Sequence, residues 1–170
     1  YPDGEQIPLD LMLDMVGRIA RAVDVPVSAD LDAGYGDAGE TVRRAIGEGV
    51  AGANIEDQLK PLDESVAAVS AAVAAAEAEG VPFALNARTD AFVRGRERSL
   101  EANIADAIER GRAFLDAGAT SVFVPGMFGE DVVTQLVEGI GHLKVTLIGL
   151  PGVPAPARLQ ELGVARLSYG

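Results

Sequence analysis

The chain contains no cysteine and no tryptophan, and only one of its 170 residues is a histidine. Without cysteine it can form no disulfide, no zinc–thiolate site and no cysteine nucleophile. Aromatic residues make up 5% of the chain and lie scattered along it, so they provide no stacking platform for nucleic-acid bases. The composition therefore excludes thiol chemistry and argues against a surface that stacks nucleic-acid bases.

Positive charge is also scarce. Lysine and arginine total 14 against 26 aspartates and glutamates, which gives a net charge of −12. Such an acidic surface repels phosphate backbones and anionic lipids, which argues against nucleic-acid and membrane partners. The longest apolar stretch, at 67–76, is far shorter than the ~20 residues that span a bilayer, and no signal peptide is visible. We therefore expect a soluble, cytoplasmic domain.

Helical and strand patterns alternate along the sequence. Short apolar runs at 26–30, 52–56, 83–87, 121–125, 144–149 and 165–169 predict six strands. Apolar residues at helical spacing fill the segments between them, and we expect Asp63 and Ser99 to cap the N-termini of two of these helices. Several helices end in glycine followed by valine or alanine, as at Gly49 and Gly80, because glycine adopts the left-handed cap conformation at little cost.

This alternation predicts a parallel sheet covered by helices, that is, an α/β fold. Two architectures share the pattern: the (β/α)8 TIM-type barrel and the open doubly wound sheet. Six strands are too few to close an eight-stranded barrel, and no Ser/Pro-rich linker divides the chain. We expect residues 1–170 to form a single domain, with either a partial barrel of about six strands or the open sheet.

Polar side chains gather where the first three predicted strands end, and ligands bind at that end in both architectures. Residues two apart on a strand point to the same face. Each of these strand ends can therefore present two polar groups together: Asp30 with Asp32, Asn54 with Glu56, and Asn86 with Arg88. The three pairs are expected to converge on one small volume.

The charges of this group do not balance. Asp30, Asp32 and Glu56 together carry −3, and Arg88 supplies only +1. Uncompensated carboxylates in a partly buried site are disfavoured, and a divalent cation would offset them. All-oxygen ligands favour Mg²⁺ or Mn²⁺ over zinc. The alternative interpretation is structural, with these carboxylates paired to Arg88 or capping the next helix.

A glycine pattern after the first strand matches the sequence pattern of a dinucleotide-binding loop. Residues 34–39 read Gly-Tyr-Gly-Asp-Ala-Gly, and Glu56 follows Gly36 by 20 residues. However, Asp30 and Asp32 precede the glycines and Asp37 lies among them, where pyrophosphate needs a helix N-terminus free of negative charge. We interpret the glycines as allowing a sharp turn beside a metal site.

The same strand ends resemble a known family. Residues 29–36 (Ala-Asp-Leu-Asp-Ala-Gly-Tyr-Gly), 54–58 (Asn-Ile-Glu-Asp-Gln) and 86–90 (Asn-Ala-Arg-Thr-Asp) resemble the isocitrate lyase/phosphoenolpyruvate mutase superfamily. Pro2-Asp3-Gly4 resembles the aspartate-bearing loop of that family. The similarity runs nearly end to end, but it matches the middle and later portion of the family. The resemblance therefore implies a (β/α)8 barrel whose remaining strands lie outside these 170 residues.

The resemblance also implies roles for individual residues. Asp30, Asp32 and Glu56 resemble the carboxylates that hold Mg²⁺, some of them through water. Arg88 resembles the arginine that pairs with the substrate carboxylate and the developing enolate charge, and Asp3 resembles an aspartate near the reacting centre. We therefore expect Asp3 and Arg88 to be catalytic. The substrate-binding residues are then expected to be Arg88, Asn86 and Asp30.

Two departures from the family pattern limit the choice of reaction. The isocitrate lyases carry a catalytic cysteine loop after the Glu-Asp-Gln strand, whereas here Gln58 runs through Lys60 directly into the next helix. Where the lyases have a glutamate after the next strand, this chain has Val124-Pro125-Gly126. Isocitrate cleavage is therefore not expected.

The resemblance thus implies a Mg²⁺- or Mn²⁺-dependent homo-oligomer, a dimer or tetramer, that acts as a C–C bond lyase. Its substrate would be a small 2-oxo or 2-hydroxy carboxylate that reacts through an enolate-like intermediate. Three other enzyme activities remain open: a carboxyvinyl-carboxyphosphonate or phosphoenolpyruvate type of phosphorylmutase, an oxaloacetate hydrolase and an oxaloacetate decarboxylase. A non-catalytic 2-oxo acid binder is the alternative outside enzymes.

Overall fold

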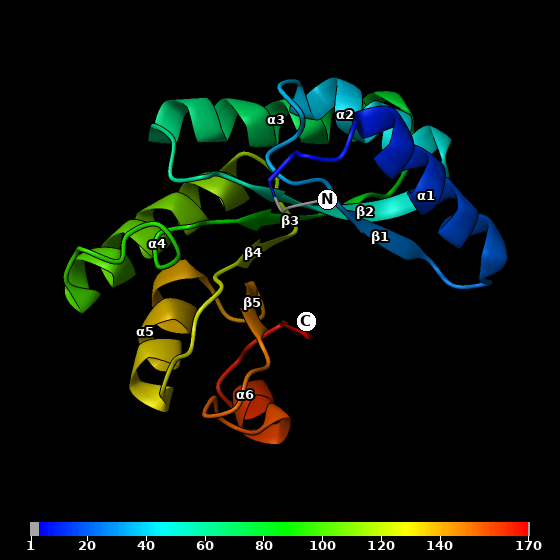
Figure 1. The fold of residues 1–170 in the computed structure, drawn as a ribbon. Helices are drawn as coiled ribbons and strands as arrows, with labels where there is room; N and C mark the ends of the chain where they lie inside the picture. The colour runs from blue at the N-terminus through cyan, green and yellow to red at the C-terminus, as the bar shows by residue number, and fades with distance from the viewer. Residues whose placement is uncertain (1–3, 170) are drawn as a thin grey trace.

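The computed structural model describes residues 4–169, in which helices and strands alternate (Figure 1). The helices are α1 (Leu9–Ala22), α2 (Ala38–Gly47), α3 (Leu62–Ala78), α4 (Leu100–Asp116), α5 (Glu130–Ile140) and α6 (Pro156–Glu161). The strands are β1 (Val27–Asp30), β2 (Val50–Glu56), β3 (Ala84–Arg88), β4 (Ser121–Phe123), β5 (Val145–Ile148) and β6 (Arg166–Ser168). Every strand predicted from the sequence is present, with ends shifted by at most a few residues.

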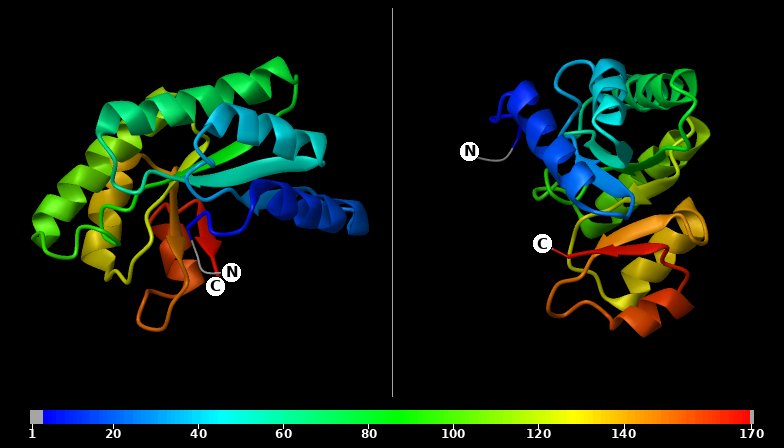
Figure 2. Two further views of the ribbon diagram at one scale, coloured as in Figure 1. Left: turned by 45° about the horizontal axis from the view of Figure 1, so that its top comes forward. Right: turned by 90° about the vertical axis from the view of Figure 1, so that its right-hand side faces the viewer.

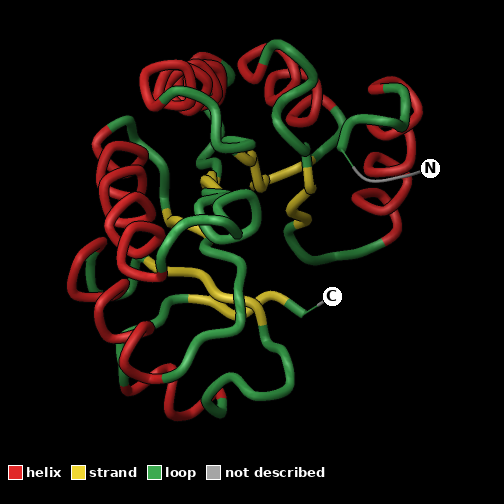
Figure 3. Tube along the Cα trace, turned by 60° about the vertical axis from the view of Figure 1, so that its left-hand side comes forward, coloured by secondary structure: helices red, strands yellow, loops and turns green. Residues whose placement is uncertain are grey.

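The six strands form one parallel sheet in the order β1-β2-β3-β4-β5-β6. The sheet curls, and the helices form an arc around its outer side (Figures 2 and 3). A doubly wound sheet needs a reversal of strand order and helices on both faces, and neither feature is found in the described residues. The structure therefore confirms a partial (β/α)8 barrel and rules out the open doubly wound alternative.

Strand register brings the polar strand ends level with one another. Asn54 lies opposite Asn86, and Glu56 lies opposite Arg88. Arg88 in turn lies opposite Phe123 on β4. Since alternate side chains of a strand point to the same face, these residues share the inner face of the curled sheet.

One of the two expected helix caps is confirmed. Ser99 caps α4, where its side-chain oxygen accepts the backbone N–H of Ala102 at 3.1 Å. The expectation for Asp63 is wrong, because α3 begins at Leu62 and its N-cap position is occupied by Pro61. Asp63 lies instead in the first turn, where a negative charge still interacts favourably with the helix dipole.

Glycine ends several helices as the sequence indicates. Gly49, Gly80, Gly118 and Gly163 have φ values of 93°, 68°, 99° and 90°. A residue with a Cβ atom is strained in this region, so glycine at these junctions allows each helix to stop and the next strand to begin.

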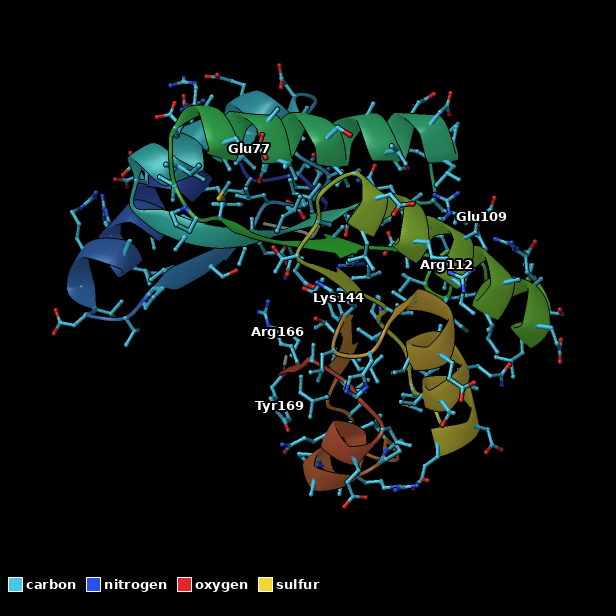
Figure 4. All side chains as sticks on the ribbon, turned by 180° about the vertical axis from the view of Figure 1, so that it is seen from behind. Glu77, Glu109, Arg112, Lys144, Arg166 and Tyr169 are labelled. Carbon is cyan, nitrogen blue, oxygen red and sulfur yellow. The ribbon has the colours of Figure 1, made fainter. Side chains whose placement is uncertain are left out.

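The apolar core fills the space between the sheet and the helices. It includes Leu31, Val42, Leu85 and Leu136, each at most 1% exposed. Charged side chains cover the outer surface of the helices, including Glu77 on α3 and Glu109 and Arg112 on α4 (Figure 4). In the described part of the chain, no helix combines the length and the apolar content that crossing a membrane requires.

Candidate active site

Pairing between the first two strands continues past the end of β1 and aligns the candidate residues. The N–H of Leu31 donates to the carbonyl of Asn54 at 3.1 Å, and the N–H of Glu56 donates to the carbonyl of Asp32 at 2.7 Å. Because Glu56 also lies opposite Arg88, the strand ends carry Asp32, Glu56 and Arg88 at the same height. The fold therefore brings together the three strand ends that the sequence singled out.

Arg88 lies between two carboxylates. Its Nη1 is 2.9 Å from Glu56 and its Nε donates to Asp90 at 2.8 Å. Burial alone would lower the pKa of Arg88, but the neighbouring Asp90 and Glu56 charges outweigh it and the pKa is raised. Arg88 thus stays cationic in a half-buried position, with two of its donors already directed by the protein.

Glu56 has less favourable charge compensation. Burial raises the pKa of Glu56, Arg88 opposes that shift, and the negative charges of Asp90 and Asp32 add to it. Arg88 cannot fully neutralise Glu56 because Asp90 shares its guanidinium. An additional cation near Glu56 would offset the remaining charge.

Asp30 ends β1, and Asp32 lies in the turn that follows. Asp32 Oδ2 accepts the N–H of Glu5 at 3.0 Å and the hydroxyl of Tyr35 at 3.3 Å. Asp30 Oδ1 accepts the N–H of Asp32 at 3.3 Å. Burial and the charge of Asp32 raise the pKa of Tyr35 to about 12, so its hydroxyl stays protonated and donates a hydrogen bond to Asp32.

Asn86 lies deeper than the other candidates, with 3% of its surface exposed. Its Nδ2 donates to Asn54 Oδ1 at 2.8 Å, while its Oδ1 accepts the hydroxyls of Ser121 at 2.7 Å and Thr146 at 3.0 Å. These bonds link the four neighbouring strands β2 to β5. Asn86 therefore holds the interior of the sheet together directly beneath Arg88.

Sequence reasoning missed Asp57, which follows Glu56 and points to the opposite side of the strand end. Its side chain is 2% exposed, and its Oδ2 accepts Arg110 Nη1 at 3.1 Å. Its Oδ1 accepts two backbone N–H groups, from Leu59 at 2.8 Å and from Asp90 at 2.9 Å. Adjacent acidic residues at a strand end must face opposite sides, and that signal could have marked Asp57 as a structural carboxylate.

Left-handed backbone conformations are concentrated at the site. Six non-glycine residues in the described range have positive φ, and four of them are Asp32, Tyr35, Gln58 and Leu59, in the loops after β1 and β2. Each such residue costs on the order of 1–3 kcal/mol and persists only where its surroundings hold it. The hydrogen bonds to Asp32 and Asp57, and that from the N–H of Tyr35 to Glu5, help to hold these loops.

The donor set at these loops suits a hard cation, because Asp30, Asp32 and Glu56 offer only carboxylate oxygens. Within residues 4–169 no three acidic or histidine side chains lie near enough to one another to enclose a metal. Mg²⁺ usually keeps several waters and binds through one or two carboxylates, so this arrangement fits that ion.

The glycine loop after β1 does not offer a pyrophosphate site. Asp37 is the N-cap of α2, and its side chain accepts the N–H of Glu40 at 2.9 Å. The helix N-terminus is thus occupied by the protein's own carboxylate, which would repel a phosphate. This agrees with interpreting the glycines as a turn.

A cavity of about 170 Å³ opens beside Glu56 and Arg88, and Lys60, Glu64 and Ser65 also line it. The expected catalytic residue Asp3 lies outside the described residues. The described site therefore provides an oriented cation, several carboxylates and a small adjoining cavity.

The chain is similar in sequence to proteins of a known family. The sequence profile of the phosphoenolpyruvate phosphomutase family matches residues 1–170. An oxaloacetate decarboxylase from Pseudomonas savastanoi pv. phaseolicola is 30% identical over 176 residues, which cover 99% of this chain and 61% of the decarboxylase. The chain thus spans about three fifths of the length of this relative.

Two solved structures share the fold. A Burkholderia cenocepacia J2315 protein provisionally assigned as a phosphonomutase has a TM-score of 0.92 and 38% identity, covering 100% of this chain and 72% of that one. A 2,3-dimethylmalate lyase, a member of the phosphoenolpyruvate mutase/isocitrate lyase superfamily, has a TM-score of 0.85 and 26% identity, covering 99% of this chain and 62% of the lyase.

Proposed function

The chain belongs to the phosphoenolpyruvate mutase/isocitrate lyase superfamily, and we propose that it is a Mg²⁺-dependent lyase. Its substrate would be a small 2-oxo or 2-hydroxy carboxylate, in which it cleaves a C–C bond. The observation that carries the proposal is Arg88, a cation fixed by Glu56 and Asp90 at the strand ends, level with Asp32. The similarity to the dimethylmalate lyase supports the same class of reaction.

Arg88 binds the substrate carboxylate in this proposal. A guanidinium forms two parallel hydrogen bonds to a carboxylate, and its charge also stabilises the negative charge that develops on an enolate. Asp30 and Asn86 complete the substrate-binding set, with Asn86 supporting the floor beneath Arg88. Asp3 is the further catalytic residue that we propose from the family resemblance.

Asp30, Asp32 and Glu56 would hold Mg²⁺, or Mn²⁺ in its place, directly or through water. When bound, the ion supplies a Lewis acid for the oxygens of the substrate. Tyr35 keeps Asp32 in place by donating its hydroxyl, and the N–H of Glu5 does the same from the other side.

Decarboxylation of oxaloacetate is the second candidate function. It is favoured by the similarity to the decarboxylase over 99% of this chain. It uses the same parts of the site, because loss of the carboxylate on the carbon beside the keto group, as CO₂, also leaves an enolate that Arg88 can stabilise.

Turnover by the full-length protein tests the proposal. Oxaloacetate, 2,3-dialkylmalates and isocitrate are supplied with Mg²⁺, and the 2-oxo acid and carboxylate products are measured by chromatography. We expect C–C cleavage of at least one malate derivative, loss of turnover with EDTA and recovery with Mg²⁺. Release of CO₂ from oxaloacetate alone would select the second candidate, and tight binding without turnover would make the protein a binder.

We also propose that the protein works as a homo-oligomer, a dimer or tetramer, as the family resemblance implies, and that it works in the cytoplasm. Sedimentation equilibrium of the full-length protein measures the mass of the assembly. A monomer at micromolar concentration would contradict this part of the proposal. Cell fractionation tests the location.

A further inference from the structure

Lys60 lies at the C-terminal end of the sheet, in the short turn between β2 and α3. Its side chain is exposed, and its ammonium makes no hydrogen bond or ion pair with any residue that the structure describes. Arg166, which begins β6, is the only other lysine or arginine in residues 4–169 whose side chain has no such contact. The charge of Lys60 is therefore available to a ligand.

One small cavity joins Lys60 to the candidate active site. The cavity of about 170 Å³ that opens beside Glu56 and Arg88 is also lined by Lys60. Glu64 lines it too, but Glu64 forms no ion pair with Lys60. Arg88 and Lys60 are the two cationic residues of this lining. A small anion in the cavity can therefore meet both of them.

The backbone at Lys60 is held on both sides. The N–H of Lys60 donates to the carbonyl of Asp57 at 2.9 Å, and the N–H of Leu59 donates to Asp57 Oδ1 at 2.8 Å. Asp57 is itself held by Arg110 at 3.1 Å. Pro61 follows at the N-cap position of α3, and a proline limits the backbone of the residue before it to extended conformations. The methylene chain of Lys60 is then the part that adjusts to a ligand.

A second carboxylate on the substrate needs a further cation at this place. Arg88 already contacts Glu56 through Nη1 and Asp90 through Nε, so its remaining donors serve one carboxylate. Asp32 and Glu56 repel any further negative charge that arrives without a cation of its own. Lys60 is the cation in the cavity lining that no carboxylate of the described residues has neutralised.

From these observations we propose that Lys60 determines specificity for dicarboxylic 2-oxo or 2-hydroxy acids. Arg88 binds one carboxylate of the substrate, and the ammonium of Lys60 binds the other through a charge-assisted hydrogen bond. Because the side chain of Lys60 is exposed, this contact selects between substrates and takes no part in breaking the C–C bond. The inference rests on the proposed function and adds a residue that recognises its substrate class.

Calorimetry on the full-length protein with Mg²⁺ tests the inference. The ligands are malate and 2-hydroxybutanoate, which have the same chain length and the same 2-hydroxy acid group. They differ only at the far end, where malate has a carboxylate and 2-hydroxybutanoate has a methyl group. The ratio of their affinities therefore isolates the second carboxylate, and we expect the wild-type protein to bind malate more tightly.

Two variants change the charge of Lys60 itself. Lys60→Gln removes the charge, and we expect it to reduce the ratio of malate to 2-hydroxybutanoate affinity about fivefold, which is the effect of a partly exposed ion pair. The affinity for 2-hydroxybutanoate should not change, which shows that the rest of the site is intact. Lys60→Arg keeps the positive charge and should keep most of the wild-type ratio.

Lys144→Gln is the matched control. Lys144 is the only other lysine of the chain, and it precedes β5 at the opposite end of the sheet. Its Nζ donates to the carbonyl of Thr120 at 3.4 Å. Removing its charge changes the net charge of the protein by the same amount, and we expect the wild-type affinity ratio to be kept.

The possible outcomes separate the role of Lys60 from the proposed function. An unchanged ratio in Lys60→Gln, or an equal reduction in Lys144→Gln, would overturn the role of Lys60 and leave the proposed function standing. The same holds if wild type binds both acids equally, or if Lys60→Arg loses as much of the ratio as Lys60→Gln. Failure of both acids to bind in the presence of Mg²⁺ would overturn the proposed function, and the role of Lys60 with it.

Discussion

The N–H of Asp90 donates to Oδ1 of Asp57 at 2.9 Å and ties the turn after β3 to the turn after β2. Asp57 also accepts Arg110 from α4, and Asp90 accepts Arg88. A chain of contacts therefore runs from a helix on the outer side of the sheet to the cation at its mouth. The orientation of Arg88 depends on carboxylates that never face the substrate.

Arg88→Lys should weaken 2-oxo acid binding at least tenfold. Lysine keeps the positive charge but lacks the planar fork that meets Glu56, Asp90 and a carboxylate together. Calorimetry with pyruvate and Mg²⁺ measures the change. Arg94→Lys is the control, since Arg94 also contacts Asp90 but its side chain is 51% exposed. Equal affinities in Arg88→Lys and wild type would reduce Arg88 to a structural partner of the acids.

Asp90→Asn should weaken 2-oxo acid binding in molecules that still fold. The change keeps the shape of the side chain but removes the charge that directs Arg88 and Arg94, so we expect about a tenfold loss of 2-oxo acid affinity.

The control for this prediction is Asp106→Asn. Asp106 accepts Arg98 at 2.7 Å and Arg110 at 3.0 Å, on the outer side of the sheet. This variant should lose stability without losing affinity per folded molecule. If both variants lowered affinity equally at the same folded fraction, Asp90 would have no specific role in positioning Arg88.

Asp32→Ala should weaken Mg²⁺ binding. It removes a charged oxygen beside Glu56 and leaves Tyr35 and Glu5 without their shared acceptor. Asp24→Ala serves as the control, because it removes the same charge from an exposed position before the N-terminal end of β1. Calorimetric titration with Mg²⁺ in the presence of oxalate measures both. Unchanged affinity in Asp32→Ala would remove Asp32 from the proposed metal site.

Arg110→Met should destabilise the protein by about 3–5 kcal/mol, because it leaves the buried carboxylate of Asp57 without its cation. Arg158→Met is the matched control. Arg158 contacts Glu130 at 2.9 Å, but the two side chains are 45% and 48% exposed, so we expect a loss of about 1 kcal/mol or less. Urea unfolding of both variants measures the difference. A similar loss in the two would show that the Asp57 contact has no special energetic role.

Local sequence patterns were sufficient to predict the elements of the fold. Six apolar runs located the six strands, and the glycines at 49, 80, 118 and 163 located helix ends, because backbone strain and side-chain periodicity act within a few residues. The places of these residues at strand ends were also informative. Asp32, Glu56 and Arg88 could be grouped in advance because parallel strands end at the same edge of a sheet.

Contacts between distant segments could not be predicted in this way. The partners of Asn86 are 32, 35 and 60 residues away, and Asp57 meets Arg110 at a separation of 53. From the sequence we expected Asn86 to bind the substrate, and only the packed sheet revealed its hydrogen bonds to three other strands. The start of α3, with Pro61 rather than Asp63 at the N-cap position, is a local difference of two residues.

The sequence by itself determined the succession of strands and helices, the family resemblance and the charged strand ends, since all of these depend on residue types and short spacings. The tertiary structure decided that the sheet curls with its helices on one side, which carboxylates face Arg88 and which face the helices. It also decided that Asn86 bonds to side chains of three other strands. These properties depend on strand register and side-chain packing, which are set only when segments far apart in the chain meet.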